Sequence, residues 1–244
     1  MYTFESRVRF SEIDHTETMT LPALVNYFQD CSTFQSESLG LGIDALKRKG
    51  KAWLLSSWQI IVERYPKMGE EILVDTWPTG FERMCGNRNF RMRTKAGEVL
   101  AYATSVWVYM DIIKGRPARP DAEEIAAYKE EEPLKMDYAP RKILLPEHTI
   151  SKETFPVRRF QIDTNEHVNN CQYIQMALEV MPECERASQV RVEYKKSAVL
   201  GDMIYPRTAE EEMRKVVILG NESGEIFATV EFKAKRKYEE VPCH

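Results

Sequence analysis

The chain carries one pattern twice, and this internal repeat constrains its fold more than any other feature of the sequence. The segment Arg9–Asp14 resembles Arg158–Asp163, and a short polar turn and then a helical pattern follow each segment. Two further matches occur in the same order, Gly69-Glu70 with Gly201-Asp202 and Gly97–Ala101 with Gly224–Ala228. Matches that keep one order along the chain indicate that a structural unit has been duplicated.

Each copy predicts one long helix near its start. In the first copy, apolar residues recur at helical spacing after Thr20, which suits an N-cap, and Gly40 is a candidate stop. These apolar residues are Leu21, Leu24, Phe28 and Cys31. In the second copy, Pro182 ends a similar stripe, because proline cannot continue a helix. That stripe is formed by Ile174, Ala177, Leu178 and Met181.

Runs rich in β-branched and aromatic residues follow each helix and predict strands. In the first copy they cover residues 53–62, 71–77, 87–93 and 99–110, and in the second 189–194, 203–207, 215–219 and 226–233. A helix that buries one apolar stripe needs a sheet to cover it. The sequence therefore predicts an α+β fold of two similar units, each a long helix packed on an antiparallel sheet.

We expect these units to span residues 1–115 and 156–244, with a linker over 116–155. Six of the twelve prolines fall between Gly115 and Pro156, together with an acidic run at Glu130–Glu132 and one short helical pattern after Pro120. Proline fixes φ and removes a hydrogen-bond donor. The linker is therefore expected to be a semi-rigid connector rather than part of the core.

Composition excludes several classes of protein. The net charge is −4, which lacks the basic surplus typical of nucleic-acid binders. No apolar run approaches the roughly 20 residues that span a bilayer, and the N-terminus lacks a signal-peptide pattern. Five cysteines without framework spacing are typical of reduced thiols. We therefore expect a cytoplasmic protein with neither nucleic-acid nor membrane partners.

The common cofactor and metal motifs are missing. Neither a P-loop nor a nucleophile-elbow pattern occurs. Gly40–Ala45 matches a dinucleotide fingerprint, but it follows a helix instead of a strand, so a helix-ending turn explains it better. None of the four histidines stands at zinc spacing from another histidine or a cysteine. We expect neither a cofactor nor a metal.

One segment, Asp163–Asn170, is dense enough in polar side chains to be a site. Aspartate and asparagine favour turns and helix caps, but capping requires only one or two of them. The first copy serves as a control, because it has threonines where the second has Asn165, His167 and Asn169. Only the aspartate is shared, as Asp14 and Asp163. The second copy therefore carries something beyond the requirements of the fold.

The pattern Asp163-x-Asn165-x-His167-Val168-Asn169-Asn170-x-x-Tyr173 resembles the signature of acyl-acyl carrier protein (acyl-ACP) thioesterases. The resemblance extends over nearly the whole chain, through Leu24–Asp30, Val62–Pro66, Val74–Trp77, Ser105–Val108 and Val192–Tyr194. That family has two tandem hot-dog domains, each a long helix wrapped by an antiparallel sheet. It hydrolyses fatty acyl-ACP to free fatty acid and ACP, which ends chain elongation. The resemblance thus implies the same fold and activity here.

The resemblance also implies that Asp163, Asn165 and His167 are catalytic. Thioester hydrolysis needs an activated water or a nucleophile, and donors for the developing oxyanion. Asp163 is the candidate base or nucleophile, and His167 the candidate to orient or shuttle a proton. Asn165 is the candidate to hold the carbonyl or the water. Asn169, at the helix start where backbone N–H groups favour negative charge, is a further candidate for substrate binding.

One departure from the family concerns the strand after this helix. Plant members carry a Glu-Cys pair there, and the aligned positions are Ser197 and Ala198. We take Ser197 as a candidate to hold a water or substrate. Cys171 follows His167 by one helical turn, but free cysteines are usually buried, so we expect core packing there.

Substrate recognition suggests further candidates. ACP is acidic, so an acidic enzyme needs a basic patch, although solvated strand ends explain the same residues equally well. The candidates are Arg158-Arg159, Lys195-Lys196 and the run Lys233-Lys235-Arg236-Lys237. We expect the acyl-chain pocket in the N-terminal unit, where Trp53 is a candidate lining residue. Trp58 and Phe90 either line it too or fill the core.

Two alternatives stay open at this point. The first is an acyl-CoA thioesterase of the same fold, since CoA also carries phosphates that a basic patch would bind. The second is a non-catalytic acyl-ACP-binding protein, because Ser197 and Ala198 replace two family residues. Sequence does not determine acyl chain length or saturation, nor whether the protein is a monomer or a homodimer.

Overall fold

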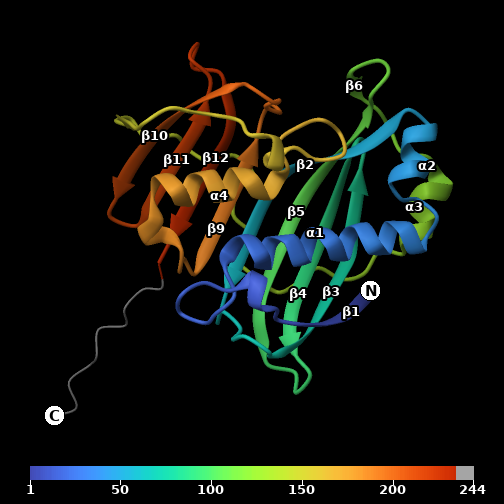
Figure 1. Ribbon diagram of the computed structural model, residues 1–244. Coiled ribbons are helices and arrows are strands. Elements are labelled where there is room, and N and C mark those ends of the chain that lie inside the picture. The colour runs from blue at the N-terminus through green and yellow to red at the C-terminus, as the bar shows by residue number, and fades with distance from the viewer. Residues whose placement is uncertain (235–244) are drawn as a thin grey trace.

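The computed structural model describes residues 1–234 of the chain, and it contains a mainly antiparallel sheet with two long helices on one face (Figure 1). The helices are α1 Leu21–Ser38, α2 Ile43–Arg48, α3 Ala122–Tyr128 and α4 Asn170–Val180. The strands of the first half are β1 Tyr2–Arg7, β2 Lys51–Val62, β3 Glu71–Glu82, β4 Cys85–Thr94, β5 Val99–Asp111 and β6 Arg116–Pro117. Those of the second are β7 Ile150–Ser151, β8 Phe155–Pro156, β9 Gln189–Tyr194, β10 Met203–Glu211, β11 Arg214–Gly220 and β12 Ile226–Lys233.

The two halves share one continuous sheet of order β1-β3-β4-β5-β2-β9-β12-β11-β10-β7. Strand β2 pairs antiparallel with β9, so that Trp58 lies opposite Val192 and Ile60 opposite Val190. Helix α1 packs on the first half of the sheet and α4 on the second, and the two helices also contact each other. The α+β fold with one long helix per half is therefore confirmed. The predicted division into residues 1–115, 116–155 and 156–244 stays a prediction.

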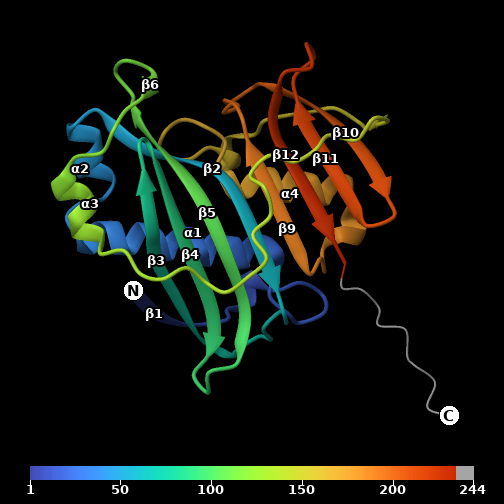
Figure 2. The same ribbon diagram turned by 180° about the vertical axis from the view of Figure 1, so that it is seen from behind.

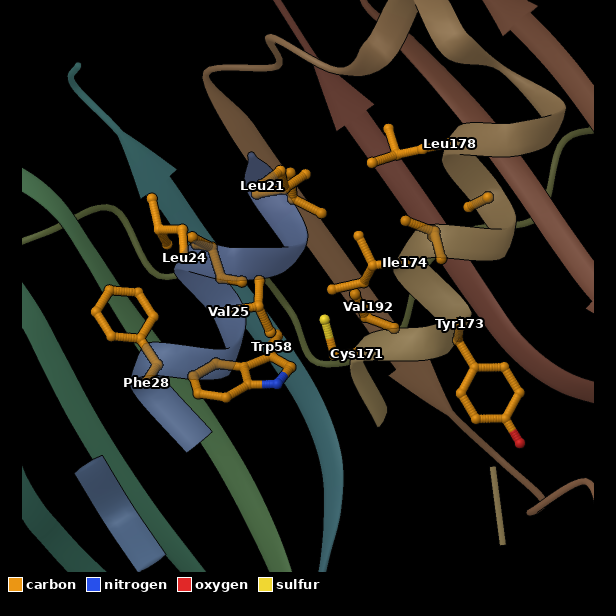
Figure 3. Close-up of a cluster of buried hydrophobic side chains, with 14 of the residues drawn as sticks. Leu21, Leu24, Val25, Phe28, Trp58, Cys171, Tyr173, Ile174, Leu178 and Val192 are labelled. Atoms are coloured by element: carbon orange, nitrogen blue, oxygen red, sulfur yellow. The ribbon is translucent and has the colours of Figure 1, made fainter. Parts of the chain in front are cut away.

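A single core joins the two halves beneath the helices. Figure 3 shows side chains of α1, including Leu24 and Phe28, beside Cys171 and Ile174 of α4 and Trp58 of β2. All five are almost completely buried. Burial of this apolar stripe, more than helix propensity, stabilises such helices in a folded protein. The sequence spacing thus identified the buried face of each helix correctly.

The predicted helix boundaries are confirmed as well. The Thr20 hydroxyl accepts a hydrogen bond from the N–H of Ala23 at 3.3 Å, which caps the start of α1. Gly40 has φ of 70°, the left-handed conformation that commonly follows a helix end. Within residues 1–234, no helix combines the length and apolar character that a membrane crossing requires.

The connector between α3 and β7 lies against the sheet. It crosses the face of the sheet opposite to the long helices (Figure 2). There, Gln59 donates from Nε2 to the Asp137 carbonyl at 2.8 Å and accepts from the Ala139 N–H at 2.9 Å. Tyr128 of α3 and Ile143 are buried. None of residues 116–154 belongs to the hydrophobic core cluster, and most of residues 129–149 are exposed or half-buried. The connector therefore lies against the sheet through polar contacts, and its role as a semi-rigid linker stays a prediction.

Candidate functional site

The aspartate-rich segment of the second copy forms a tight turn before α4. The Asp163 carboxylate accepts hydrogen bonds at Oδ1 from the N–H of Asn165 at 2.7 Å and of His167 at 3.4 Å. The Asp163 N–H donates to the His167 carbonyl at 2.8 Å, and Glu166 takes a φ of 61°. Side-chain acceptance of a backbone N–H two residues on is the usual role of aspartate in turns. The turn thereby brings Asp163, Asn165 and His167 together.

The matching turn of the first copy uses its aspartate differently. Asp14 Oδ1 accepts from the N–H and the hydroxyl of Thr16, at 2.9 and 2.6 Å, while Oδ2 pairs with Arg186. Burial alone would raise the pKa of Asp14, but the hydrogen bonds from Thr16 and the charge of Arg186 outweigh it and lower that pKa. Asp163 has no ion pair within residues 1–234, and its Oδ2 has no hydrogen-bond partner there. One turn therefore has a neutralised carboxylate and the other an available one.

The other predicted residues of the turn have distinct surroundings. The His167 backbone forms a β-bridge with Val199, and its imidazole is half-buried without a hydrogen-bond partner in the described chain. The Asn169 side chain accepts from the Cys171 N–H at 2.9 Å and so caps α4, as Thr20 caps α1. Asn169 therefore performs a structural task common to both copies. The sequence comparison obscured this, because threonine and asparagine both serve as caps.

A cavity of about 160 Å³ opens beside this turn. Water needs only ~10–15 Å³ of such space, so the cavity admits a much larger group. Asn165 and Thr164 of the turn line it together with Trp53 of β2. Lys47 of α2 donates to the Thr164 carbonyl at 3.2 Å and so links the two halves here. Asp163, His167, Asn169 and Ser197 do not line this cavity.

The candidate aromatics of the first half divide between cavity and core. Trp53 lines the cavity, where its ring packs at 4.8 Å from Tyr109 and 5.9 Å from Phe81, measured between centroids. Trp58 and Phe90 instead pack against each other at 4.8 Å in the core. The indole ring at position 53 is therefore available to a bound molecule, and that at position 58 is not.

The segment that departs from the family lies beside the turn. The buried Ala198 accepts at its carbonyl from the Val168 N–H at 2.9 Å, and its own N–H donates to the Tyr173 hydroxyl at 2.8 Å. Ser197 is exposed and its hydroxyl has no partner in the described chain. This segment supports the turn through its backbone.

Cys171 is fully buried, and its thiol donates to the Pro22 carbonyl at 3.2 Å. Burial raises its pKa to about 12. Only the thiolate is a good nucleophile, so Cys171 is inert at neutral pH. The expectation of core packing is confirmed.

Thiol labelling checks this assignment. Iodoacetamide at neutral pH should modify Cys85, which is partly exposed, and leave Cys171 unmodified in the folded protein. Peptide mass spectrometry measures both sites. In guanidinium, where burial is lost, both should react equally. Early modification of Cys171 in the folded state would contradict its assignment to the core.

Sequence reasoning missed the polar wall of the cavity, formed by Ser36, Asn87, Arg88 and Tyr128 among others. A signal was present, because Asn87, Arg88 and Asn89 form a polar run inside a strand. Central strands are usually apolar on at least one face.

Of the basic candidates for a partner surface, Arg158 and Arg159 are exposed without ion pairs in residues 1–234. Lys195 and Lys196 pair with Glu193 and Glu225, and Lys235, Arg236 and Lys237 lie outside the described residues.

Comparison with known families gives a match over most of the chain. The family model of the acyl-ACP thioesterase N-terminal domain matches residues 1–128, and that of the C-terminal domain matches residues 146–235. A chloroplastic palmitoyl-acyl carrier protein thioesterase of Gossypium hirsutum is 28% identical over 78% of this chain and 50% of its own length. The chloroplastic acyl-[acyl-carrier-protein] hydrolase FATB3 of Cuphea viscosissima is 30% identical over 72% and 45%, respectively. The chain thus spans about half the length of the curated relatives it matches.

Solved structures resemble the whole chain. A putative oleoyl thioesterase from Lactobacillus plantarum superposes with a TM-score of 0.83 and 25% identity, covering 95% of this chain and 94% of that one. An acyl-ACP thioesterase from Bacteroides thetaiotaomicron gives a TM-score of 0.85 at 24% identity, covering 95% and 96%. The predicted tandem hot-dog fold is confirmed by these neighbours.

Proposed function

Because the chain belongs to the acyl-ACP thioesterase family, we propose that it hydrolyses the thioester of fatty acyl-ACP to free fatty acid and ACP. The observation that carries the proposal is the difference between the two matched aspartates. Asp14 is paired with Arg186, whereas Asp163 keeps an oxygen without a partner in the described chain, in a turn whose Thr164 and Asn165 line a cavity. A duplicated fold needs both turns, but catalysis needs only one free carboxylate.

In this proposal the acyl chain enters the cavity and the thioester carbonyl lies at the turn. As a base, Asp163 removes a proton from a water molecule while the water oxygen forms a bond to the carbonyl carbon; the C–S bond then breaks, and the leaving sulfur takes up that proton to give the free thiol of ACP. As a nucleophile, the Asp163 carboxylate itself forms the bond to the carbonyl carbon, and the C–S bond breaks to release the sulfur, which takes a proton from solvent. Water then hydrolyses the resulting acyl-aspartyl anhydride, which releases the fatty acid and restores the carboxylate. Asn165 positions the carbonyl or the water, and His167 orients or relays the proton. Backbone N–H groups at the start of α4 favour the developing negative charge.

The carrier is tested by comparing one acyl chain on ACP and on CoA. We expect a higher kcat/KM for the ACP thioester, measured as thiol release. Equal rates on both carriers would make the protein an acyl-CoA thioesterase as much as an acyl-ACP one.

The cytoplasmic location also stays a prediction, and the curated relatives cited above are named chloroplastic.

We further propose that Arg158 and Arg159 contact ACP. Both are exposed and unpaired in residues 1–234, they precede Asp163 by a few residues, and the neighbouring Phe160 is 77% exposed. An apolar side chain next to two free cations matches an acidic partner with an apolar surface. Lys195 and Lys196 are weaker candidates, because glutamates already neutralise them.

Replacing both arginines by alanine should raise KM for acyl-ACP about tenfold, since each exposed charge pair is worth about 0.5–1 kcal/mol. The value of kcat should change little, and added salt should shrink the difference between variant and wild type. The matched control is the Lys195→Ala, Lys196→Ala variant, which also loses two charges and should change KM less. A short acyl-pantetheine thioester, which lacks the carrier protein, should react equally with all three. An equal rise in both variants would contradict docking at Arg158 and Arg159.

A further inference from the structure

The cavity beside the turn contains a buried cation without a counter-charge. Arg88 of β4 is 7% exposed and lines the cavity wall. Its Nη1 donates to Gln35 Oε1 and, at 3.1 Å, to Thr76 Oγ1. Its guanidinium carbon lies 5.4 Å from the centre of the Tyr128 ring. Within residues 1–234, no carboxylate forms an ion pair with Arg88, and its Nε and Nη2 have no hydrogen-bond partner.

A buried charge without a partner costs free energy, and a ligand made only of hydrocarbon would not offset that cost. Burial lowers the pKa of Arg88 to about 10, so the group is still charged at neutral pH. Buried charges are ordinarily paired, because desolvation without a partner costs several kcal/mol. Arg88 faces Gln35, Thr76 and an aromatic ring, which are all neutral. An oxygen acceptor in the cavity would supply the missing partner.

Trp53, which lines the same cavity, carries a second unpaired donor. The Nε1–H of Trp53 is buried and has no hydrogen-bond partner in the described chain. Buried donors without partners are uncommon and call for an explanation such as an absent ligand. The rings of Trp53 and Phe81, 5.9 Å apart, provide apolar surface beside these donors. The cavity therefore combines aromatic walls with two groups that can each donate a hydrogen bond.

We propose that this cavity selects acyl chains that carry an oxygen function, such as a hydroxyl, an oxo group or a terminal carboxylate, which Arg88 and Trp53 bind. This inference rests on the proposed acyl-ACP hydrolysis and names the class of acyl group. Sites built to hydrogen-bond a substrate oxygen discriminate strongly against analogues that lack it. Arg88 and Trp53 are thus specificity residues, since they contact the chain and not the reacting thioester.

The test compares kcat/KM for acyl-ACPs of equal chain length that are unsubstituted, β-hydroxylated, ω-hydroxylated or ω-carboxylated. Wild-type protein should prefer at least one oxygenated chain over the plain one. Arg88→Met, which keeps the volume but not the charge, should reduce that preference, measured as the ratio of kcat/KM for oxygenated and plain chains, on the order of tenfold to a hundredfold. Which substituted chain loses most identifies the oxygen group. If none of these acyl-ACPs releases thiol, the proposed hydrolysis itself is refuted. A preference for the plain chains is a different result and overturns only this inference.

Two further variants separate recognition from packing. Trp53→Phe keeps an aromatic ring but removes the Nε1–H, and it should lower the preference for oxygenated chains. Trp58→Phe is the matched control, because its Nε1 is also buried without a partner in the described chain but lies in the core away from the cavity. It should leave the preference unchanged. If Arg88→Met lowers kcat/KM equally for plain and oxygenated chains while the thermal midpoint of unfolding is unchanged, Arg88 does not recognise an oxygen on the chain and the inference is wrong.

Discussion

Replacing Asp163 by asparagine is expected to lower kcat by about a hundredfold to ten-thousandfold, the range over which a general base contributes. Asparagine retains the side-chain oxygen that accepts hydrogen bonds from the N–H groups of Asn165 and His167. It can neither remove a proton from water nor act as a nucleophile. The fold should therefore persist while turnover is lost, as measured by thiol release together with thermal unfolding.

Asp14→Asn is the matched control in the other copy. It should keep turnover but lower the free energy of unfolding by about 1 kcal/mol at neutral pH, since the pair with Arg186 is partly exposed. Because the pKa of Asp14 is lowered on folding, its contribution is present at neutral pH and lost as pH falls through the folded pKa. Wild type and variant should thus converge in acid. Full turnover in Asp163→Asn would remove Asp163 from the mechanism.

Phe28→Ala is expected to destabilise the protein by about 3–5 kcal/mol, the usual cost of deleting a buried phenylalanine. Phe28 is 0% exposed and packs against both Trp58 and Phe90, with ring centroids 6.2 and 5.4 Å away. The cavity left there cannot collapse easily, because a helix and a sheet frame it (Figure 3). Urea unfolding of the purified variant measures the change.

The same helix offers a control for this substitution. Phe34 of α1 is 45% exposed and contacts only the ring of Phe4 among the aromatic side chains of residues 1–234. Phe34→Ala should cost about 1 kcal/mol or less. Similar losses in the two variants would show that the core beneath α1 is not as closely packed as described.

Much of the fold was predictable, because it depends on periodicity. The apolar stripe around Leu24 and Phe28 identified α1, and the runs rich in β-branched and aromatic residues identified the long strands. Strand β1 was missed, since this short edge strand alternates only between exposed and half-buried positions. The contacts between the connector and the sheet were not predictable for another reason. The connector's carbonyls and N–H groups are satisfied by Gln59 and other side chains that are distant in sequence.

The candidate site was predictable in part. Asp163, Asn165 and His167 do share one turn, because residues within a segment of five positions necessarily lie close together. The difference between Asp14 and Asp163 depends on Arg186, which is 172 positions beyond Asp14. No local pattern could reveal that pair. The charge of Arg88 in the cavity wall was hidden likewise, because burial of a strand residue depends on which helix covers it.

We propose above that this chain cleaves acyl-ACP with the carboxylate of Asp163. The most direct test mixes excess protein with radiolabelled acyl-ACP and follows both free thiol and free fatty acid through one turnover. We predict that wild type and Asp14→Asn release both products together, and that Asp163→Asn binds acyl-ACP but leaves the thioester intact. Tight binding of acyl-ACP by wild type without release of thiol would contradict the account and make the protein a non-catalytic acyl-ACP binder.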